Sequence, residues 1–141
     1  FMISHCSNYI AGHNRQSQKA IDLEFQHLGI RATQGDLLLF INDNPGLSQK
    51  QIATMMILDP SLVGRDLKLL ISAHYVKSID APGDSRTHQI FLTESGQKTA
   101  DDLQKIVSNW WLKTLQNSPE TDKDILVTQL RHLYFSLLPK S

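Results

Sequence analysis

The sequence has one cysteine, Cys6, among its 141 residues, so no internal disulfide can form. A single thiol is typical of a reducing compartment, and we expect a cytoplasmic protein. No apolar run approaches the roughly 20 residues that cross a membrane, and no signal-peptide pattern is present. We therefore predict a protein that has no membrane partner.

Patterns of catalysis and metal binding are also missing. The sequence shows no arrangement of nucleophile, base and acid, and no glycine-rich loop of the kind that cradles a phosphate. His5, Cys6 and His13 match no zinc-ligand spacing. We predict that the protein is not an enzyme and that it has no metal and no cofactor.

Net charge is absent too, since 14 Lys and Arg balance 14 Asp and Glu. This balance argues weakly against a nucleic-acid partner, although the distribution of charge matters more than its total. Residues 45–92 hold five basic and four acidic residues, an excess of one charge. A nucleic-acid site in this stretch would therefore depend on the geometry of individual side chains.

The length suits a single domain with a real core, which we place at residues 1–141. The clearest local pattern is the stretch 59–73. Asp59 can cap a helix, and Pro60 at the first helical position loses only an amide that has no helical partner. Helical spacing then sorts the stretch into two faces. An inward face holds Val63, Leu67, Leu70 and His74, and a polar face without acids holds Ser61, Gly64, Arg65, Lys68 and Ser72.

The flanking segments complete a pattern. Before this helix, Ser48 and Gln51 form a capping box that starts a short helix, and residues 57–59 connect the two helices tightly. Two short helices joined in this way are typical of a helix-turn-helix. After it, residues 75–79 and 87–92 are predicted strands joined by a loop at 80–85, which is a wing.

Four further helices are expected. Scattered apolar residues over 3–28 predict a first helix whose apolar face is too sparse for a central core and suits an interface. Thr33 is expected to cap a second helix that stops at the turn residues 42–46. Thr93 is expected to cap a long helix to about 117, and a last apolar helix follows over 121–138.

This order of elements and three motifs resemble the MarR family of bacterial transcriptional regulators. The motifs are residues 58–65 at the start of the second helix of the pair, residues 80–86 with Asp84 and Arg86 in the wing, and Leu92-Thr93-Glu94-Ser95-Gly96 after it. The resemblance implies a mainly α fold with a small β-hairpin wing. Its winged helix-turn-helix DNA-binding lobe (30–97) would be flanked by dimerisation helices (1–29 and 98–141).

The resemblance also implies a function. We expect a sequence-specific regulator, a repressor released by a small anionic aromatic effector, that binds double-stranded DNA as a homodimer on a pseudo-palindromic operator. One branch of the family senses peroxides through an N-terminal cysteine, so redox sensing through Cys6 is an alternative. A winged-helix module used for protein–protein contact is another, which the zero net charge favours.

The polar face of the stretch supplies the candidate DNA contacts. Arg65 can donate two hydrogen bonds to guanine, unless it is a surface arginine paired with an acid such as Asp66. Ser61 can donate to a base or a phosphate, or act only within the first turn. Lys68 suits a phosphate. Gln49 and Lys50 lie where phosphates would pass, or are plain surface residues.

Gly64 and the wing leave alternatives open. Relatives commonly carry Thr or Ser at the position of Gly64, which therefore reflects either drift or a close approach of the backbone to DNA. Arg86 can enter the minor groove from the wing. Asp84 either holds that arginine by a charge-assisted hydrogen bond, or is a turn former beside Gly83, or does both.

An effector would lie between the first helix and the winged lobe. We name His13, Arg15 and Phe40 as candidate ligand-binding residues on position alone. Trp110 and Trp111 are candidates to line a pocket, although aromatic residues on a long helix are more often part of a core.

Overall fold

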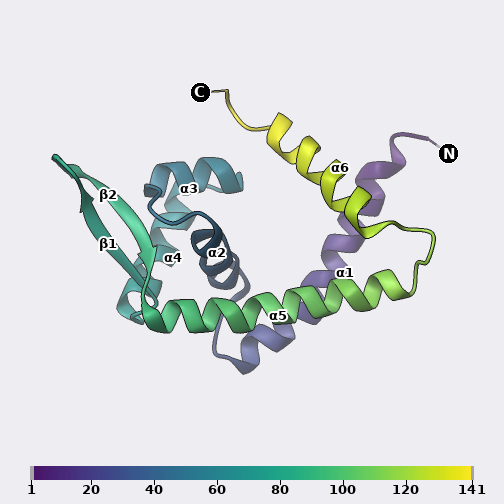
Figure 1. Ribbon diagram of the computed structural model, residues 1–141, viewed down its shortest axis with the longest axis horizontal. Helices are drawn as coiled ribbons and strands as arrows, with labels where there is room; N and C mark the ends of the chain where they lie inside the picture. The colour runs from purple at the N-terminus through teal and green to yellow at the C-terminus, as the bar shows by residue number, and fades with distance from the viewer. Residues whose placement is uncertain (1, 141) are drawn as a thin grey trace.

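The wing and three short helices gather at one end of the molecule, and two long helices lead away from them (Figure 1). The computed structural model describes residues 2–140. Over this range the elements are α1 (His5–His27), α2 (Ala32–Asp43), α3 (Gln49–Met56), α4 (Pro60–Ser72), β1 (Val76–Ala81), β2 (Asp84–Leu92), α5 (Glu94–Gln116) and α6 (Lys123–Ser136). The predicted fold class, mainly helical with a two-stranded wing, is confirmed.

The core lies where α2, α3 and α4 meet the base of the wing and the start of α5. The residues that fill it are almost fully buried: Phe25, Leu37, Leu38, Ile41, Ile52, Val63, Leu67, Leu70, Val76, Ile90 and Leu103. The inward face predicted for α4 is thus confirmed for its three aliphatic members. It is wrong for His74, which is exposed. The helix ends at Ser72, and His74 follows it in a left-handed conformation with φ of 65°.

The start of α2 also differs from the prediction. Thr33 is the second residue of this helix, and its N-cap is Arg31, whose backbone is extended. The amide of Arg31 donates to the side chain of Gln34 at 3.4 Å. The capping side chain is therefore that of Gln34, the third residue of the helix. A search for serine or threonine at the N-cap position does not detect such a contact.

The wing is longer than predicted, because most of the expected loop 80–85 belongs to the strands. Ala81 pairs directly with Asp84, so only Pro82 and Gly83 remain for the turn. Gly83 has φ of 77°, which a two-residue hairpin turn requires and which glycine adopts without strain. An irregularity between Asp80 and Ala81 shifts the register near the tip.

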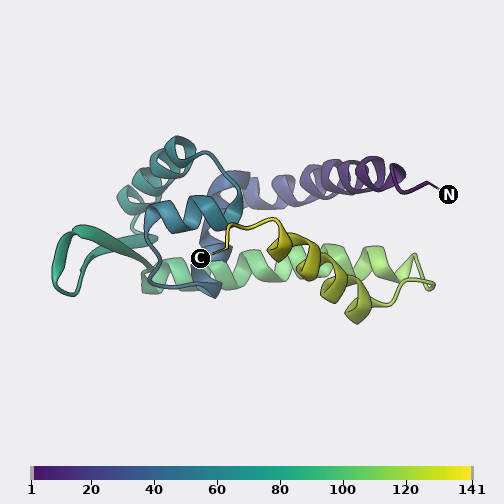
Figure 2. The ribbon, with the colours of Figure 1, turned by 90° about the horizontal axis from the view of Figure 1, so that it is seen from above.

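Helices α1 and α5 run alongside each other in opposite directions, and α6 turns back from the far end of α5 (Figures 1 and 2). The N-terminus thus lies at the end of the molecule away from the wing, whereas α6 leads the chain back toward α3. Within residues 2–140, no helix is both long enough and apolar enough to cross a membrane.

Candidate nucleic-acid interface

Each helix of the predicted helix-turn-helix begins with an N-cap side chain that accepts a backbone amide. The amide of Gln51 donates to the Ser48 hydroxyl at 3.1 Å, and the amide of Ser48 donates to the Gln51 side chain at 2.9 Å. At the start of α4, the amide of Ser61 donates to the Asp59 carboxylate at 3.0 Å. Ile57 makes the turn between the helices in a left-handed conformation with φ of 57°. Both predicted caps are confirmed.

The wing is tied to this pair of helices by a bridge that the sequence did not indicate. The amide of Gly46 donates to the Ile90 carbonyl at 2.8 Å, and the amide of Ile90 donates to the Leu47 carbonyl at 2.9 Å. Leu47 therefore pairs with β2 as a third, one-residue strand just before α3. This contact fixes the distance between the start of α3 and the wing.

A groove runs between the start of α3, one side of α4 and the wing. Five of the predicted DNA-contacting residues line it, namely Gln49, Lys50, Gly64, Lys68 and Arg86. Ser48, the N-cap of α3, lines it as well, and so do Ser78, Thr87 and His88 of the wing. The sequence did not indicate these three wing residues, because only the fold brings the hairpin beside α3. None of the lining residues is acidic, and three permanent cations, Lys50, Lys68 and Arg86, line the groove.

Ser61 and Arg65 lie outside the groove, on the exposed surface of α4. Within residues 2–140, no acid lies within ion-pair distance of Arg65. Asp66, the partner considered for it, is itself only 6% exposed. The Arg65 guanidinium is therefore available to a ligand outside the protein.

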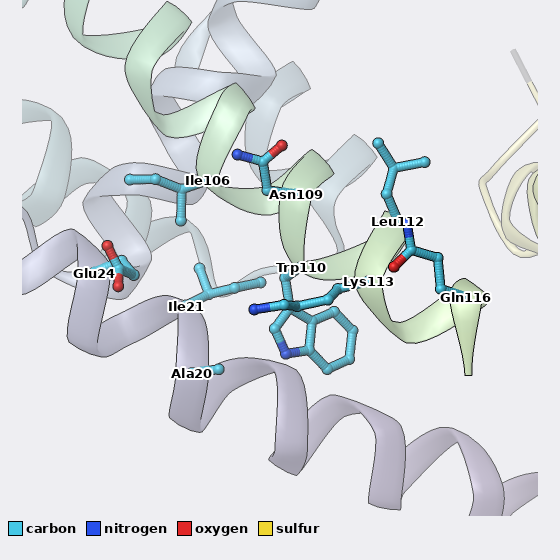
Figure 3. A pocket seen from close by; sticks show the side chains of 9 residues that line it. All are labelled: Ala20, Ile21, Glu24, Ile106, Asn109, Trp110, Leu112, Lys113 and Gln116. Carbon is cyan, nitrogen blue, oxygen red and sulfur yellow. The ribbon is translucent and has the colours of Figure 1, made fainter. Parts of the chain in front are cut away.

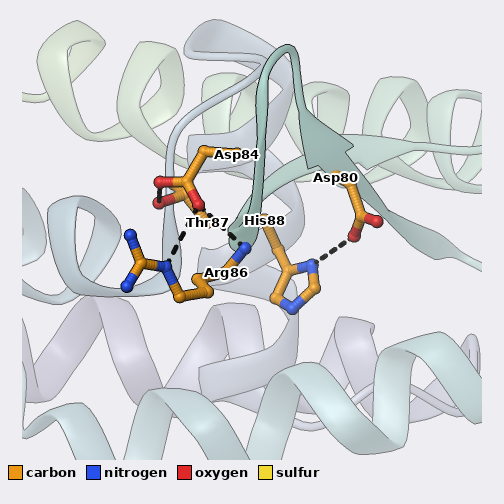
Figure 4. A network of polar contacts seen from close by, with 5 residues as sticks. All are labelled: Asp80, Asp84, Arg86, Thr87 and His88. Carbon is orange, nitrogen blue, oxygen red and sulfur yellow. Dashed lines mark hydrogen bonds and ion pairs between the residues drawn. The ribbon is translucent and has the colours of Figure 1, made fainter.

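The four acids of residues 45–92 are all engaged within the fold. Asp59 caps α4, and Asp66 is buried. Asp80 lies 2.9 Å from the Nδ1 atom of His88, and Asp84 pairs with Arg86 (Figure 4). Only Asp66 of the four is buried, but none of them lines the groove, which is therefore more basic than the count for the stretch suggests.

Asp84 organises the tip of the wing, as Figure 4 shows. Its carboxylate accepts the Arg86 amide at 3.0 Å and the Thr87 hydroxyl at 2.9 Å, and it lies 3.6 Å from the Arg86 guanidinium. The hydrogen bond from the Arg86 amide, followed by the one from Thr87, lowers the pKa of the Asp84 carboxyl. Asp84 is therefore both a turn residue and the partner of the wing arginine, and the Arg86 side chain stays 94% exposed.

A second cavity, of about 690 Å³, lies between α1 and α5 (Figure 3). Trp110, Ile21 and Ile106 supply apolar surface, while Asn109, Lys113 and Glu24 supply polar groups. Its size is in the range of small-molecule sites, which are about 300–1,000 Å³. Of these residues, only Trp110 was considered from the sequence.

The three candidate ligand residues are not brought together. His13 stacks on Trp111 with ring planes 9° apart and centroids separated by 6.2 Å. Arg15 is exposed on α1, and Phe40 packs against the hydrophobic core. Their role in binding an effector stays a prediction. Cys6 is exposed near the start of α1.

Large apolar side chains remain uncovered on α1 and α6. None of the 14 residues of α6 is buried. Leu133 and Leu137 are 61% and 71% exposed, and on α1 Tyr9 and Ile10 are 61% and 57% exposed. Two helices with such faces are typical of a protein whose core is completed by another chain.

Comparison with known sequences shows what the winged lobe is similar to. Residues 28–87 match the model of the MarR family. The HTH-type transcriptional regulator BilQ of Clostridioides difficile is 28% identical over 93 residues, which are 66% of this chain and 63% of that protein. The matched stretch thus spans slightly less than two thirds of that relative. BilQ of Clostridium symbiosum is 26% identical over 110 residues, 78% of this chain and 76% of that protein.

Solved structures extend the likeness over nearly the whole chain. A MarR transcriptional regulator from Methanosarcina mazei Go1 superposes with a TM-score of 0.79 at 25% identity, over 94% of this chain and 95% of that one. A mutant MarR from E. coli, solved in complex with operator DNA, shares the fold with a TM-score of 0.73 at 21% identity, over 97% of this chain and 95% of that one. These proteins are regulators and not enzymes. The chain is thus similar to the MarR family of winged helix-turn-helix transcriptional regulators, in sequence over residues 28–87 and in fold over nearly its whole length.

Proposed function

We propose that this protein binds double-stranded operator DNA in the cytoplasm as a homodimer and represses transcription until an effector releases it. The observation that carries the proposal is the groove between α3, α4 and the wing, which Lys50, Lys68 and Arg86 line and no acidic residue lines. Three cations that line one groove suit the phosphates of a duplex. The polar face of α4 beside them has the size and chemistry to enter a major groove.

Each residue has a separate role in this proposal. Arg65, exposed and free of ion pairs within residues 2–140, donates to guanine in the major groove. Ser61 contacts a phosphate or base at the start of α4, while Lys50 and Lys68 contact phosphates. Arg86 reaches the minor groove from the wing, and Asp84 holds its backbone and guanidinium.

The test is a fluorescence-anisotropy titration of the protein on the intergenic DNA upstream of its own gene. Arg65→Ala should weaken binding by about 1–3 kcal/mol and reduce discrimination between the operator and mutated operators. Lys68→Ala should weaken binding to all duplexes alike. It should also reduce the slope of the logarithm of the binding constant against the logarithm of the salt concentration by about one, because one fewer phosphate contact is made. Lys105→Ala, which changes an exposed lysine of α5, is the matched control and should bind as the wild type does.

Absence of sequence-selective binding by the wild type at moderate salt would refute the proposal. That result would favour the alternative that the winged helix binds another protein. This alternative predicts that Arg65 and Arg86 can be replaced without loss of regulation. The two outcomes differ in a reporter assay as well, because only the DNA-binding proposal ties regulation to Arg65.

The homodimer is supported by the uncovered apolar faces of α1 and α6. A second copy of the chain is the partner whose surface matches them, because an interface with two-fold symmetry joins the same patch of both subunits. Two winged lobes related by that symmetry would then read the two halves of a pseudo-palindromic operator.

The effector is proposed to occupy the cavity between α1 and α5. The Trp110 ring offers an aromatic face, and Lys113 offers the cation that a carboxylate requires (Figure 3). Benzoate should therefore quench tryptophan fluorescence and weaken DNA binding, whereas uncharged benzyl alcohol should do neither. Lys113→Met should abolish the response to benzoate. An unchanged response in Lys113→Met would place the effector elsewhere.

A further inference from the structure

Helix α4 carries a glycine at its centre, and the side chain of one residue of α3 covers it. A Cβ atom at Gly64 would lie 2.6 Å from the Nε2 atom of Gln49, 3.4 Å from its Cδ and 3.7 Å from its Oε1. All three of the nearest atoms belong to Gln49. The carboxamide of Gln49 thus fills the space that any other residue at position 64 would need.

Backbone conformation does not explain this glycine. The described glycines with positive φ are Gly29, Gly46 and Gly83, and Gly64 is not among them. It lies inside the regular helix Pro60–Ser72. Since an interior helical glycine is about 1 kcal/mol less favourable than alanine, stability alone favours alanine here. What glycine contributes at this position is room.

The carboxamide that uses this room is free to bind a ligand. Within residues 2–140 it has no hydrogen-bond partner, in contrast to the side chain of Gln51, which accepts the Ser48 amide at 2.9 Å. Gln49 lines the same groove as Lys50, Lys68 and Arg86. A neutral amide among three cations, with no acid on the groove, is surrounded by groups that attract phosphate.

We propose that Gly64 is a positioning residue for DNA binding, because the space it leaves lets the Gln49 carboxamide lie against α4 and donate its N–H to a backbone phosphate. This inference rests on the proposed function. A Cβ at position 64 displaces the carboxamide from α4, and the donor no longer points to the phosphate. Gly64 therefore acts through Gln49 and does not itself touch the DNA.

The experiment is a double-mutant cycle measured by anisotropy on two labelled duplexes. One duplex is selected from a random pool by the wild-type protein, and the other has the same composition in shuffled order. Gly64→Ala and Gln49→Ala should each weaken binding to both duplexes by about tenfold, the worth of one hydrogen bond to a charged group. The double variant should bind no more weakly than Gln49→Ala alone.

Two controls separate positioning from folding. The melting temperature of Gly64→Ala should equal or exceed that of the wild type, because alanine favours the helix. Thr54→Ala, a change on the exposed surface of α3 outside the groove, should leave binding unchanged.

Several results would overturn the inference. If Gly64→Ala weakens binding as much in the Gln49→Ala background as in the wild type, the added methyl group meets the DNA directly. If Gly64→Ala leaves binding unchanged, the carboxamide has no role. If the loss is confined to the selected duplex, Gln49 reads a base and not a phosphate. A wild-type protein that enriches no duplex would refute DNA binding itself, and this inference with it.

Discussion

At the scale of single residues, Gly96 explains why the motif Leu92-Thr93-Glu94-Ser95-Gly96 ends in glycine. The Thr93 hydroxyl donates to the His74 carbonyl at 2.6 Å and accepts the Gly96 amide at 3.0 Å. The Thr93 amide donates to the Tyr75 carbonyl at 3.0 Å. A Cβ at Gly96 would overlap this same Tyr75 oxygen. The motif therefore docks the start of α5 onto the segment that joins α4 to β1, and only glycine fits there.

Replacing Gly96 with alanine should lower the free energy of unfolding by about 2–3 kcal/mol, since the clash is with backbone that cannot move aside. Chemical denaturation followed by circular dichroism measures this change. Gly64→Ala is the matched control, because the same added methyl group meets only the flexible end of Gln49. Equal stability of the two variants would contradict the docking role of Gly96.

At the scale of elements, α6 is tied to the helix-turn-helix by one polar contact. The Tyr134 hydroxyl donates to the carbonyl of Met55, near the end of α3. This carbonyl lies in the last turn of α3, where helical carbonyls lack amide partners. Partial burial raises the pKa of the Tyr134 hydroxyl, so it remains a donor throughout the neutral range. The contact links the proposed dimerisation helix to the DNA-binding pair.

Tyr134→Phe keeps the ring and removes only this donor. We expect the free energy of unfolding to fall by about 1 kcal/mol. We also expect the backbone amides at the end of α3 to exchange with deuterium faster. Tyr9→Phe is the control, because the ring of Tyr9 lies on the exposed surface of α1. The same exchange rates in both variants would show that the contact does not hold α3.

The scale of elements also shows how far the sequence predicts the fold. The caps at Ser48, Asp59 and Thr93 gave correct starts for three helices, because a cap involves residues two or three positions apart. The start of α2 and the length of the hairpin were missed. Those features depend on a side chain reaching back to Arg31 and on strand pairing at the tip, which composition does not reveal.

At the scale of the whole molecule, the chain has more apolar surface than it can bury alone. The stripe Leu126, Leu130, Leu133 and Leu137 follows one side of α6, and Leu133 and Leu137 are largely exposed. Burial of one such side chain is worth about 1.5–3 kcal/mol. A second chain that covers this stripe would therefore contribute strongly to stability.

Leu133→Glu should convert the proposed dimer to a monomer, because it places a charge in the middle of the apolar stripe. Light scattering after size-exclusion chromatography measures the mass in solution. Thr128→Glu adds the same charge on the polar side of α6 and should leave the dimer intact. A wild-type mass of one chain would exclude the homodimer.

Stability of the whole molecule should also depend on the junction of α1 and α2. Burial raises the pKa of the Asp36 carboxyl to about 6, and the charge of Asp22 adds to this effect. The folded protein therefore keeps a proton that the unfolded chain has lost. Stability should fall as the pH rises from about 4, the ordinary aspartate value, to about 6.

Asp36→Asn removes the ionisation and should stabilise the protein at pH 7 but not at pH 4. Because the Asp36 side chain keeps contact with solvent, screening limits the gain to about 1 kcal/mol. Thermal denaturation across this pH range measures it. Asp22→Asn should give a smaller gain, since it removes only the neighbouring charge. If Asp36→Asn stabilises the protein more at pH 4 than at pH 7, the pKa of Asp36 is not raised by folding.

The sequence by itself determined the helix-turn-helix, the wing and the resemblance to the MarR family, because caps, turn residues and helical spacing act over a few neighbouring positions. It also named five residues that line the groove. Only the tertiary structure decided where the charges act. The bridge between Leu47 and Ile90 joins residues more than forty positions apart and brings Arg86 beside Lys50 and Lys68. None of the four acids lines the groove, so a stretch with one excess charge presents a basic groove.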